Sequence, residues 1–108
     1  MDALDRSRDA LFVERLHAKT IARGIAWAPS EHEGRYQVEL GDWLVEIGEA
    51  GAEGAEILIC GKDGQALELI APDPSDDNRR MFAETYEAAR RIALGVDTVI
   101  ESLIQSLG

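Results

Sequence analysis

The sequence is organised around residues 76–108, DDNRRMFAETYEAARRIALGVDTVIESLIQSLG. In this stretch apolar residues recur alternately four and three positions apart from Phe82 to Leu107, the spacing of one face of an α-helix. A second row widens that face and consists of Met81, Ala88, Ile92, Val99 and Ile104. A stripe of this width has to be buried. We therefore expect a long C-terminal helix that packs on the rest of the protein.

Gly95 is the weak point of this predicted helix, because glycine is unfavourable inside helices. Thr98 followed by Glu101 has the spacing of a capping box, so the helix could break near Gly95 and restart at Thr98. The apolar stripe nevertheless runs through Gly95 in phase. We therefore expect an uninterrupted or gently bent helix.

Residues 36–47 predict a β-hairpin, because two alternating runs are separated only by Gly41 and Asp42. One face then holds only apolar pairs: Tyr36 with Ile47, Val38 with Val45, and Leu40 with Trp43. The reverse face carries Glu39 and Glu46. A slip of one residue would bury both carboxylates, so the alternation defines the register.

Residues 57–60 and 66–71 predict a second hairpin around Asp63 and Gly64. Its two-residue turn places Leu58 opposite Leu69 and Cys60 opposite Leu67, which we expect to face the core. Ile57, Ile59 and Ile70 then fall on the opposite face, near Leu44. An apolar patch of that kind, if exposed, usually marks an interface.

The predicted fold is α+β, with a helix over residues 2–23, a four-stranded antiparallel meander and the long C-terminal helix (α-β-β-β-β-α). Both helices should cover the sheet face that carries Tyr36 and Ile47. The chain has 108 residues, which is the size of one domain spanning 1–108. Its single Cys60 cannot form a disulfide within the chain.

The composition is acidic, with 21 Asp and Glu against 11 Lys and Arg and a formal net charge of -10. Such a charge opposes binding to phosphate backbones and to anionic lipid. No apolar run is long enough to cross a membrane, and residues 1–8 lack the apolar core of a signal peptide. We expect no direct nucleic-acid binding, no membrane association and a cytoplasmic location.

No motif in the sequence predicts a catalytic residue, a metal site or a cofactor. His17 and His32 have no third ligand at metal spacing, and Glu39 with Glu46 fits the solvated face of a sheet. An alternative is that the protein is a small metal-dependent hydrolase that uses these two carboxylates and a loop histidine. The concentrated positive charge is at Arg79, Arg80, Arg90 and Arg91. These arginines either balance neighbouring acids or bind the acidic surface of a partner.

Several short motifs resemble a small bacterial domain of uncharacterised function. They are LFxxRLxxKT (residues 11–20), a Trp27 before Pro29, LGxW (40–43) and YEAARRxALGVD (86–97). The resemblance implies a bacterial cytoplasmic protein and brings no activity, ligand or catalytic residue. Size, charge and element order are also similar to those of the small acidic dimeric chaperones of type III secretion.

These observations predict a non-enzymatic, acidic protein–protein interaction module that forms a homodimer, such as an adaptor, an antitoxin or immunity protein, or a chaperone. An acidic mimic of nucleic acid is a further alternative. The predicted interface residues are Leu44, Ile57, Ile59, Ile70, Ile92, Val99 and Leu103.

Overall fold

The computed structural model describes residues 3–50, 54–72 and 76–108. It confirms the α+β class, with a helix, an antiparallel sheet and then helices. The elements in chain order are α1 (Ala3–Ile21), β1 (Ala28–Pro29), β2 (Arg35–Leu40), β3 (Trp43–Glu49), β4 (Ala55–Gly61), β5 (Ala66–Ile70), α2 (Asp76–Leu94) and α3 (Val96–Leu107).

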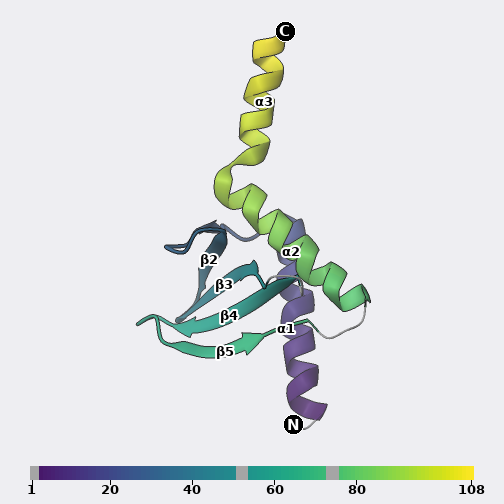
Figure 1. Cartoon of the computed structure of the whole chain (residues 1–108), viewed down its shortest axis with the longest axis vertical. Coiled ribbons are helices and arrows are strands. Elements are labelled where there is room, and N and C mark those ends of the chain that lie inside the picture. The colour runs from purple at the N-terminus through teal and green to yellow at the C-terminus, as the bar shows by residue number, and fades with distance from the viewer. Residues whose placement is uncertain (1–2, 51–53, 73–75) are drawn as a thin grey trace.

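The sheet has the strand order β1-β2-β3-β4-β5, and every neighbouring pair is antiparallel. Figure 1 shows α1 and α2 crossing on one face of this sheet, while α3 extends from the end of α2 away from the other elements. The two helices therefore cover one face of the sheet, as predicted, and α3 takes no part in that layer.

The sheet contains five strands rather than the predicted four. The additional strand, β1, has only two residues and pairs Ala28 with Gln37 and Pro29 with Tyr36. Proline is tolerated there because β1 is at the edge of the sheet. Two residues are too few to show an alternating pattern, which is why the sequence did not indicate this strand.

The first hairpin has the predicted register, with Tyr36 opposite Ile47, Val38 opposite Val45 and Leu40 opposite Trp43. In the second hairpin Ile57 pairs with Ile70 and Leu58 with Leu69, also as predicted. A β-bulge then shifts the register, so that Cys60 lies opposite Ala66 instead of Leu67.

The prediction of which face of the second hairpin meets the core was wrong. Pairing between β3 and β4 places Ile57 beside Ile47 and Ile59 beside Val45, on the side that the helices cover. Ile57 and Ile70 are consequently buried in the core, and Ile59 is partly buried against it. Leu69 lies instead on the other face of the sheet and is exposed.

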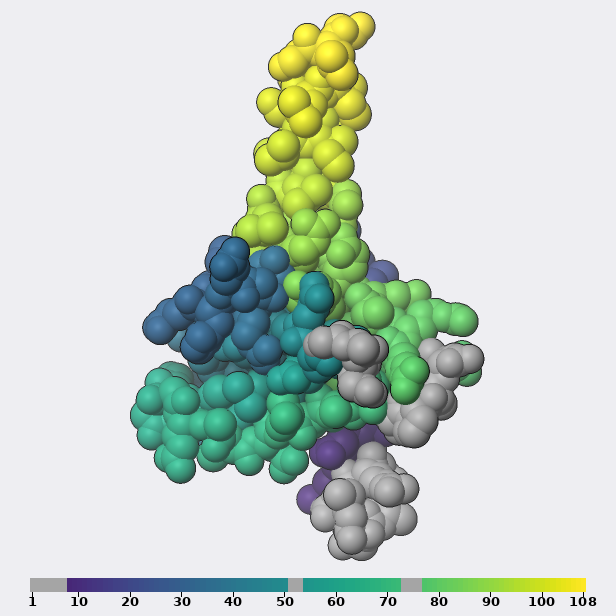
Figure 2. Space-filling model, viewed as in Figure 1, coloured from purple at the N-terminus to yellow at the C-terminus, as the bar shows by residue number. Residues whose placement is uncertain are grey.

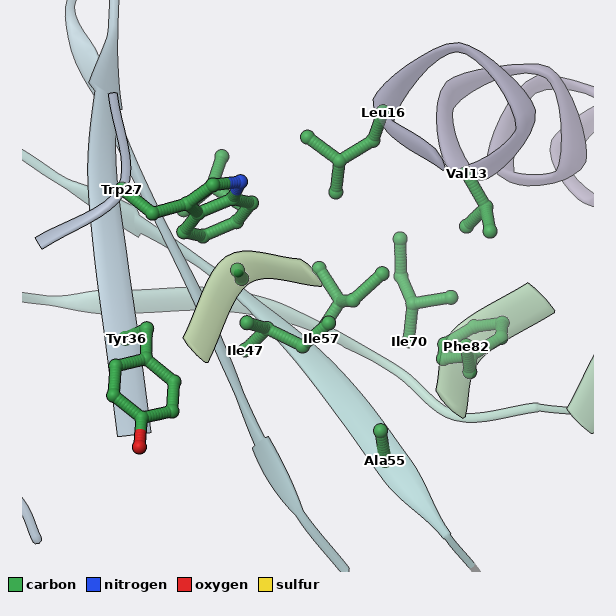
Figure 3. Packing of buried hydrophobic residues seen from close by; sticks show 11 residues of the cluster. Val13, Leu16, Trp27, Tyr36, Ile47, Ala55, Ile57, Ile70 and Phe82 are labelled. Carbon is green, nitrogen blue, oxygen red and sulfur yellow. The ribbon is translucent and has the colours of Figure 1, made fainter. Parts of the chain in front are cut away.

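The core lies between the sheet and the two helices (Figure 3). Val13 and Leu16 of α1 point toward the sheet residues Ile57 and Ile70, and Phe82 of α2 lies beside Ile70. Trp27 closes the core next to Tyr36, and the other buried members of the cluster are Val45, Ile47, Ala55 and Ala89. Truncating a large side chain in such a core to alanine typically costs about 2–5 kcal/mol.

The C-terminal helix breaks at Gly95, contrary to the expected uninterrupted or gently bent helix. Gly95 has a φ of 64° and is the N-cap of α3, which begins at Val96. Glycine adopts this left-handed conformation readily, whereas other residues are strained in it. The break is therefore one residue long. It does not follow the Thr98 capping box.

Asp97 fixes the junction between α2 and α3. Its carboxylate accepts hydrogen bonds from Arg91 of α2 at 2.7 Å and from Arg23, in the segment after α1, at 3.4 Å. The hydrogen bond from Arg91, followed by the weaker effect of Arg23, lowers the pKa of Asp97 below its ordinary value. Asp97 therefore connects α3 to both other helical regions.

Candidate interaction surface

The most exposed apolar surface of the described residues is on α3. None of the residues of α3, all of which the structure describes, is buried. The exposed fraction of its large apolar side chains runs from 42% at Ile100 to 88% at Leu107, with Val99, Leu103 and Ile104 between these values. In the space-filling view α3 projects as a column beyond the rest of the surface (Figure 2).

These side chains form one continuous stripe. Because successive residues of a helix are about 100° apart around its axis, all of its apolar residues fall within an arc of about 140° bounded by Val99 and Ile104. The members of this α3 stripe are Val96, Val99, Ile100, Leu103, Ile104 and Leu107. The remaining arc is polar, and its charged residues are Asp97 and Glu101. α3 is thus strongly amphipathic and has an unpaired apolar side.

The predicted interface residues do not form one surface. Val99 and Leu103 are exposed members of the α3 stripe. Ile57 and Ile70 are buried, and Ile59 and Ile92 are partly buried against the core, so these four residues contribute little accessible surface. Leu44 is half-buried on the opposite face of the sheet, between Glu39 and Cys60.

Sequence reasoning assigned Ile100, Ile104 and Leu107 to a buried stripe, whereas the structure exposes them. Helical periodicity shows that these residues share a side of a helix but not whether another element covers that side. A second set of exposed apolar residues is also outside the predicted interface: Leu40 and Trp43 at the end of the first hairpin, and Leu67 and Leu69 on β5.

The four arginines of α2 are not equivalent. Arg90 donates to both oxygens of Glu87, at 3.2 and 2.6 Å, and Arg91 donates to Asp97. Arg79 and Arg80 are exposed near the start of α2. Arg90 and Arg91 therefore balance acids of their own chain, which matches the simpler of the two interpretations for that half of the cluster.

The face of the sheet away from the helices carries a buried ionic cluster around Glu46, whose exposed fraction is only 6%. The Glu46 carboxylate accepts hydrogen bonds from Nε of Arg35 and from Oγ of Ser30, the latter at 3.2 Å. Arg35 also lies 3.5 Å from Glu56, and Nδ1 of His32 lies 3.8 Å from Glu46. These contacts hold the loop after β1 against the sheet.

The predicted pair of carboxylates is therefore divided. Glu39 is exposed, whereas Glu46 is buried and engaged by Arg35 and Ser30. In the described ranges no three His, Cys, Asp or Glu side chains are grouped as a metal ion would require. The hydrolase and nucleic-acid-mimic hypotheses remain predictions.

Cys60 is buried near this ionic cluster. Burial raises the pKa of its thiol, and the Glu46 carboxylate raises it further, while Arg35 acts in the opposite direction. A thiol with a raised pKa and little access to solvent is a poor nucleophile. Its position fits a small apolar residue of the sheet.

Comparisons of the chain with protein-family models, with curated proteins and with solved structures found no match. Among the described helices, none has the length and apolar character that would be needed to cross a membrane.

Proposed function

We propose that this protein is a cytoplasmic, non-enzymatic protein–protein interaction module that self-associates as a homodimer through α3. The supporting observation is the continuous apolar stripe on α3. The exposed fraction of its large side chains is lowest at Ile100, with 42%, and highest at Leu107, with 88%. An adaptor, antitoxin-like or chaperone-like role would use such a surface. Exposed apolar patches on monomeric proteins are usually small, and continuous ones commonly mark protein contacts.

The energetics favour a protein partner for α3. An isolated helix of this length is marginal in water, because few residues share the cost of nucleation. Complete burial of a Val, Leu or Ile side chain contributes about 1.5–3 kcal/mol, so burying the half-exposed residues of one stripe contributes on the order of 1 kcal/mol each. Association costs roughly 4–15 kcal/mol. Two stripes facing each other therefore offset the free-energy cost of association better than one stripe against a polar surface does.

The charge of α3 argues against an anionic membrane as its partner. Helices that lie on membrane surfaces are rich in Lys and Arg on their polar side. The polar side of α3 carries Asp97 and Glu101, and the sequence has no basic residue after Arg91. The stripe is thus better suited to another apolar protein surface.

Sedimentation equilibrium over a range of concentrations tests self-association, using Leu103→Ser and Leu69→Ser as a matched pair. The two leucines are equally exposed, at 55% and 53%, but Leu103 is on α3 and Leu69 on β5. Neither substitution should disturb the core. We expect a wild-type dimer that Leu103→Ser weakens by at least about tenfold, which corresponds to 1.4 kcal/mol. A monomeric wild type, or a dimer weakened only by Leu69→Ser, would contradict the proposal.

A further inference from the structure

The pattern of the α3 stripe is symmetric about its own centre. Counting from the midpoint between Glu101 and Ser102, apolar residues occur at equal distances on both sides: Ile100 and Leu103, Val99 and Ile104, Val96 and Leu107. The polar residues are symmetric in the same way. Turned end to end, the helix therefore presents the same apolar outline.

From this symmetry we infer that α3 pairs antiparallel with α3 of a second copy of the chain, about a two-fold axis at the midpoint between residues 101 and 102. Val96 would then lie opposite Leu107 of the second copy, Val99 opposite Ile104, and Ile100 opposite Leu103. An isologous two-fold contact uses the same patch on both copies, which a symmetric stripe satisfies. This inference rests on the proposed self-association and assigns its geometry.

The charge of Asp97 favours the antiparallel direction. In that arrangement Asp97 is level with Ser106 of the second copy, and the two copies of Asp97 are about 14 Å apart along the helix axis. In a parallel pair in the same register, the two copies of Asp97 would be level with each other. Like charges repel more strongly the closer they lie. The two copies of Glu101 lie close to the midpoint in both arrangements and do not select a direction.

The net charge of the whole chain acts in the same direction. Each copy has a formal net charge of -10, and Asp97 and Glu101 are the only charged residues of α3, so a net charge of -8 is on the residues that precede α3. A parallel pair would bring these two acidic bodies to the same end of the α3 pair. An antiparallel pair places them at opposite ends, separated by the length of α3, about 18 Å.

Crosslinking of two single-cysteine variants tests the direction. Val96→Cys and Leu107→Cys are each prepared in a Cys60→Ser background, with tags of different size. Each variant alone, and a mixture of the two after the copies have exchanged partners, is treated with a short bis-maleimide. In the antiparallel pair, position 96 lies opposite position 107, whereas the two copies of position 96 are about 16 Å apart along the helix axis. We expect a covalent dimer in the mixture and none in either separate sample.

Leu107→Cys by itself covers the case that Val96→Cys disturbs the junction at Gly95, because a parallel pair would bring its two copies together, whereas the antiparallel pair keeps them about 16 Å apart along the helix axis. Circular dichroism and sedimentation equilibrium check that every variant is folded and associates. Covalent dimer from each variant alone means a parallel pair and overturns the inference but not self-association. Association without crosslinking in the mixture or in either separate sample means that α3 binds another surface and also overturns the inference. A wild-type monomer overturns the inference together with the proposed function.

Discussion

The guanidinium group of Arg35 lies directly over Gly48, the residue opposite it in the neighbouring strand β3. A β-carbon at position 48 would be 2.6 Å from Cζ and 2.8 Å from Cγ of Arg35. Arg35 is held in this position by Glu46 and Glu56. Glycine at position 48 is thus required by the close approach of a side chain, and it allows Arg35 to cross the strand and neutralise the buried Glu46.

Gly48→Ala should therefore reduce the free energy of unfolding by about 1–3 kcal/mol, as overpacking typically does. Urea unfolding followed by fluorescence measures the change. Gly61→Ala is the control, because a β-carbon there would meet only Oδ1 of Asp63, at 3.0 Å, which belongs to an exposed side chain held by one hydrogen bond from the Gln65 backbone N–H. Equal losses for the two substitutions would mean that the contact with Arg35 does not determine the residue at position 48.

Thr20→Val should leave a buried donor without an acceptor. The Thr20 hydroxyl accepts a hydrogen bond from the indole Nε1 of Trp27 at 3.0 Å, and both residues are buried. Valine has nearly the same shape but no acceptor, so we expect a loss of about 1–3 kcal/mol in the free energy of unfolding.

The matched control for this prediction is Thr85→Val. Thr85 is as completely buried as Thr20, but its hydroxyl donates to the backbone carbonyl of Met81 in its own helix. Replacing it removes the donor itself and leaves no unpaired N–H group. We expect a clearly smaller loss of stability, measured in the same urea titration, and similar losses at both positions would refute the assignment.

Ionisation of the Tyr86 phenol should make the protein less stable at high pH. Burial, and then the charge of the nearby Glu49, raise the pKa of Tyr86 to about 12 from an ordinary value of 10.0. The single phenol O–H is shared between two acceptors, the Gly34 carbonyl at 3.0 Å and the Glu49 carboxylate at 3.2 Å. Because the folded pKa is raised, the stabilisation is complete below pH 10 and is lost as the pH rises from 10 to about 12.

Urea midpoints measured between pH 9 and pH 12 should therefore fall for the wild type across this window. Tyr86→Phe has no ionisable phenol and should lose this part of the pH dependence, although it is less stable at neutral pH because the hydrogen bond of the phenol is absent. An unchanged alkaline slope in Tyr86→Phe would show that another group is responsible.

Gly95→Ala should disfavour the bend between α2 and α3. A left-handed conformation costs a non-glycine residue about 1–2 kcal/mol, whereas alanine is the most favourable residue within a helix. We expect the population to move toward one continuous helix through residue 95. Spin labels at positions 31 and 105, in a Cys60→Ser background at a concentration below self-association, would report a changed distance distribution.

Gly108→Ala is the control for this substitution. Gly108 also has a positive φ, of 77°, but it follows α3 and is not at the junction. It should leave the distance distribution as in the wild type. If Gly95→Ala also retained the wild-type distribution, the contacts of Asp97 with Arg91 and Arg23 would be sufficient to hold the bend.

The local pattern of the sequence determined the elements and part of their pairing. Alternation in residues 36–47, with Gly41 and Asp42 between the two runs, fixed the register of the first hairpin, because a one-residue slip would exchange its apolar and acidic faces. The period of residues 76–107 identified the helical apolar side. That period also led to the prediction that Val99 and Leu103 belong to an interface.

Only the tertiary structure decided which apolar residues are buried. Ile57 and Leu58 are similar side chains on opposite faces of β4, and the pairing of β4 with β3 selects Ile57 for the core. The local sequence around Gly95 is compatible with a straight or a bent helix. In the structure the helix bends there, and Asp97 accepts hydrogen bonds from Arg91 and Arg23. That bend directs α3 away from the sheet and leaves its stripe uncovered. Periodicity specifies the side of a helix that prefers burial, but burial itself depends on elements distant in the sequence.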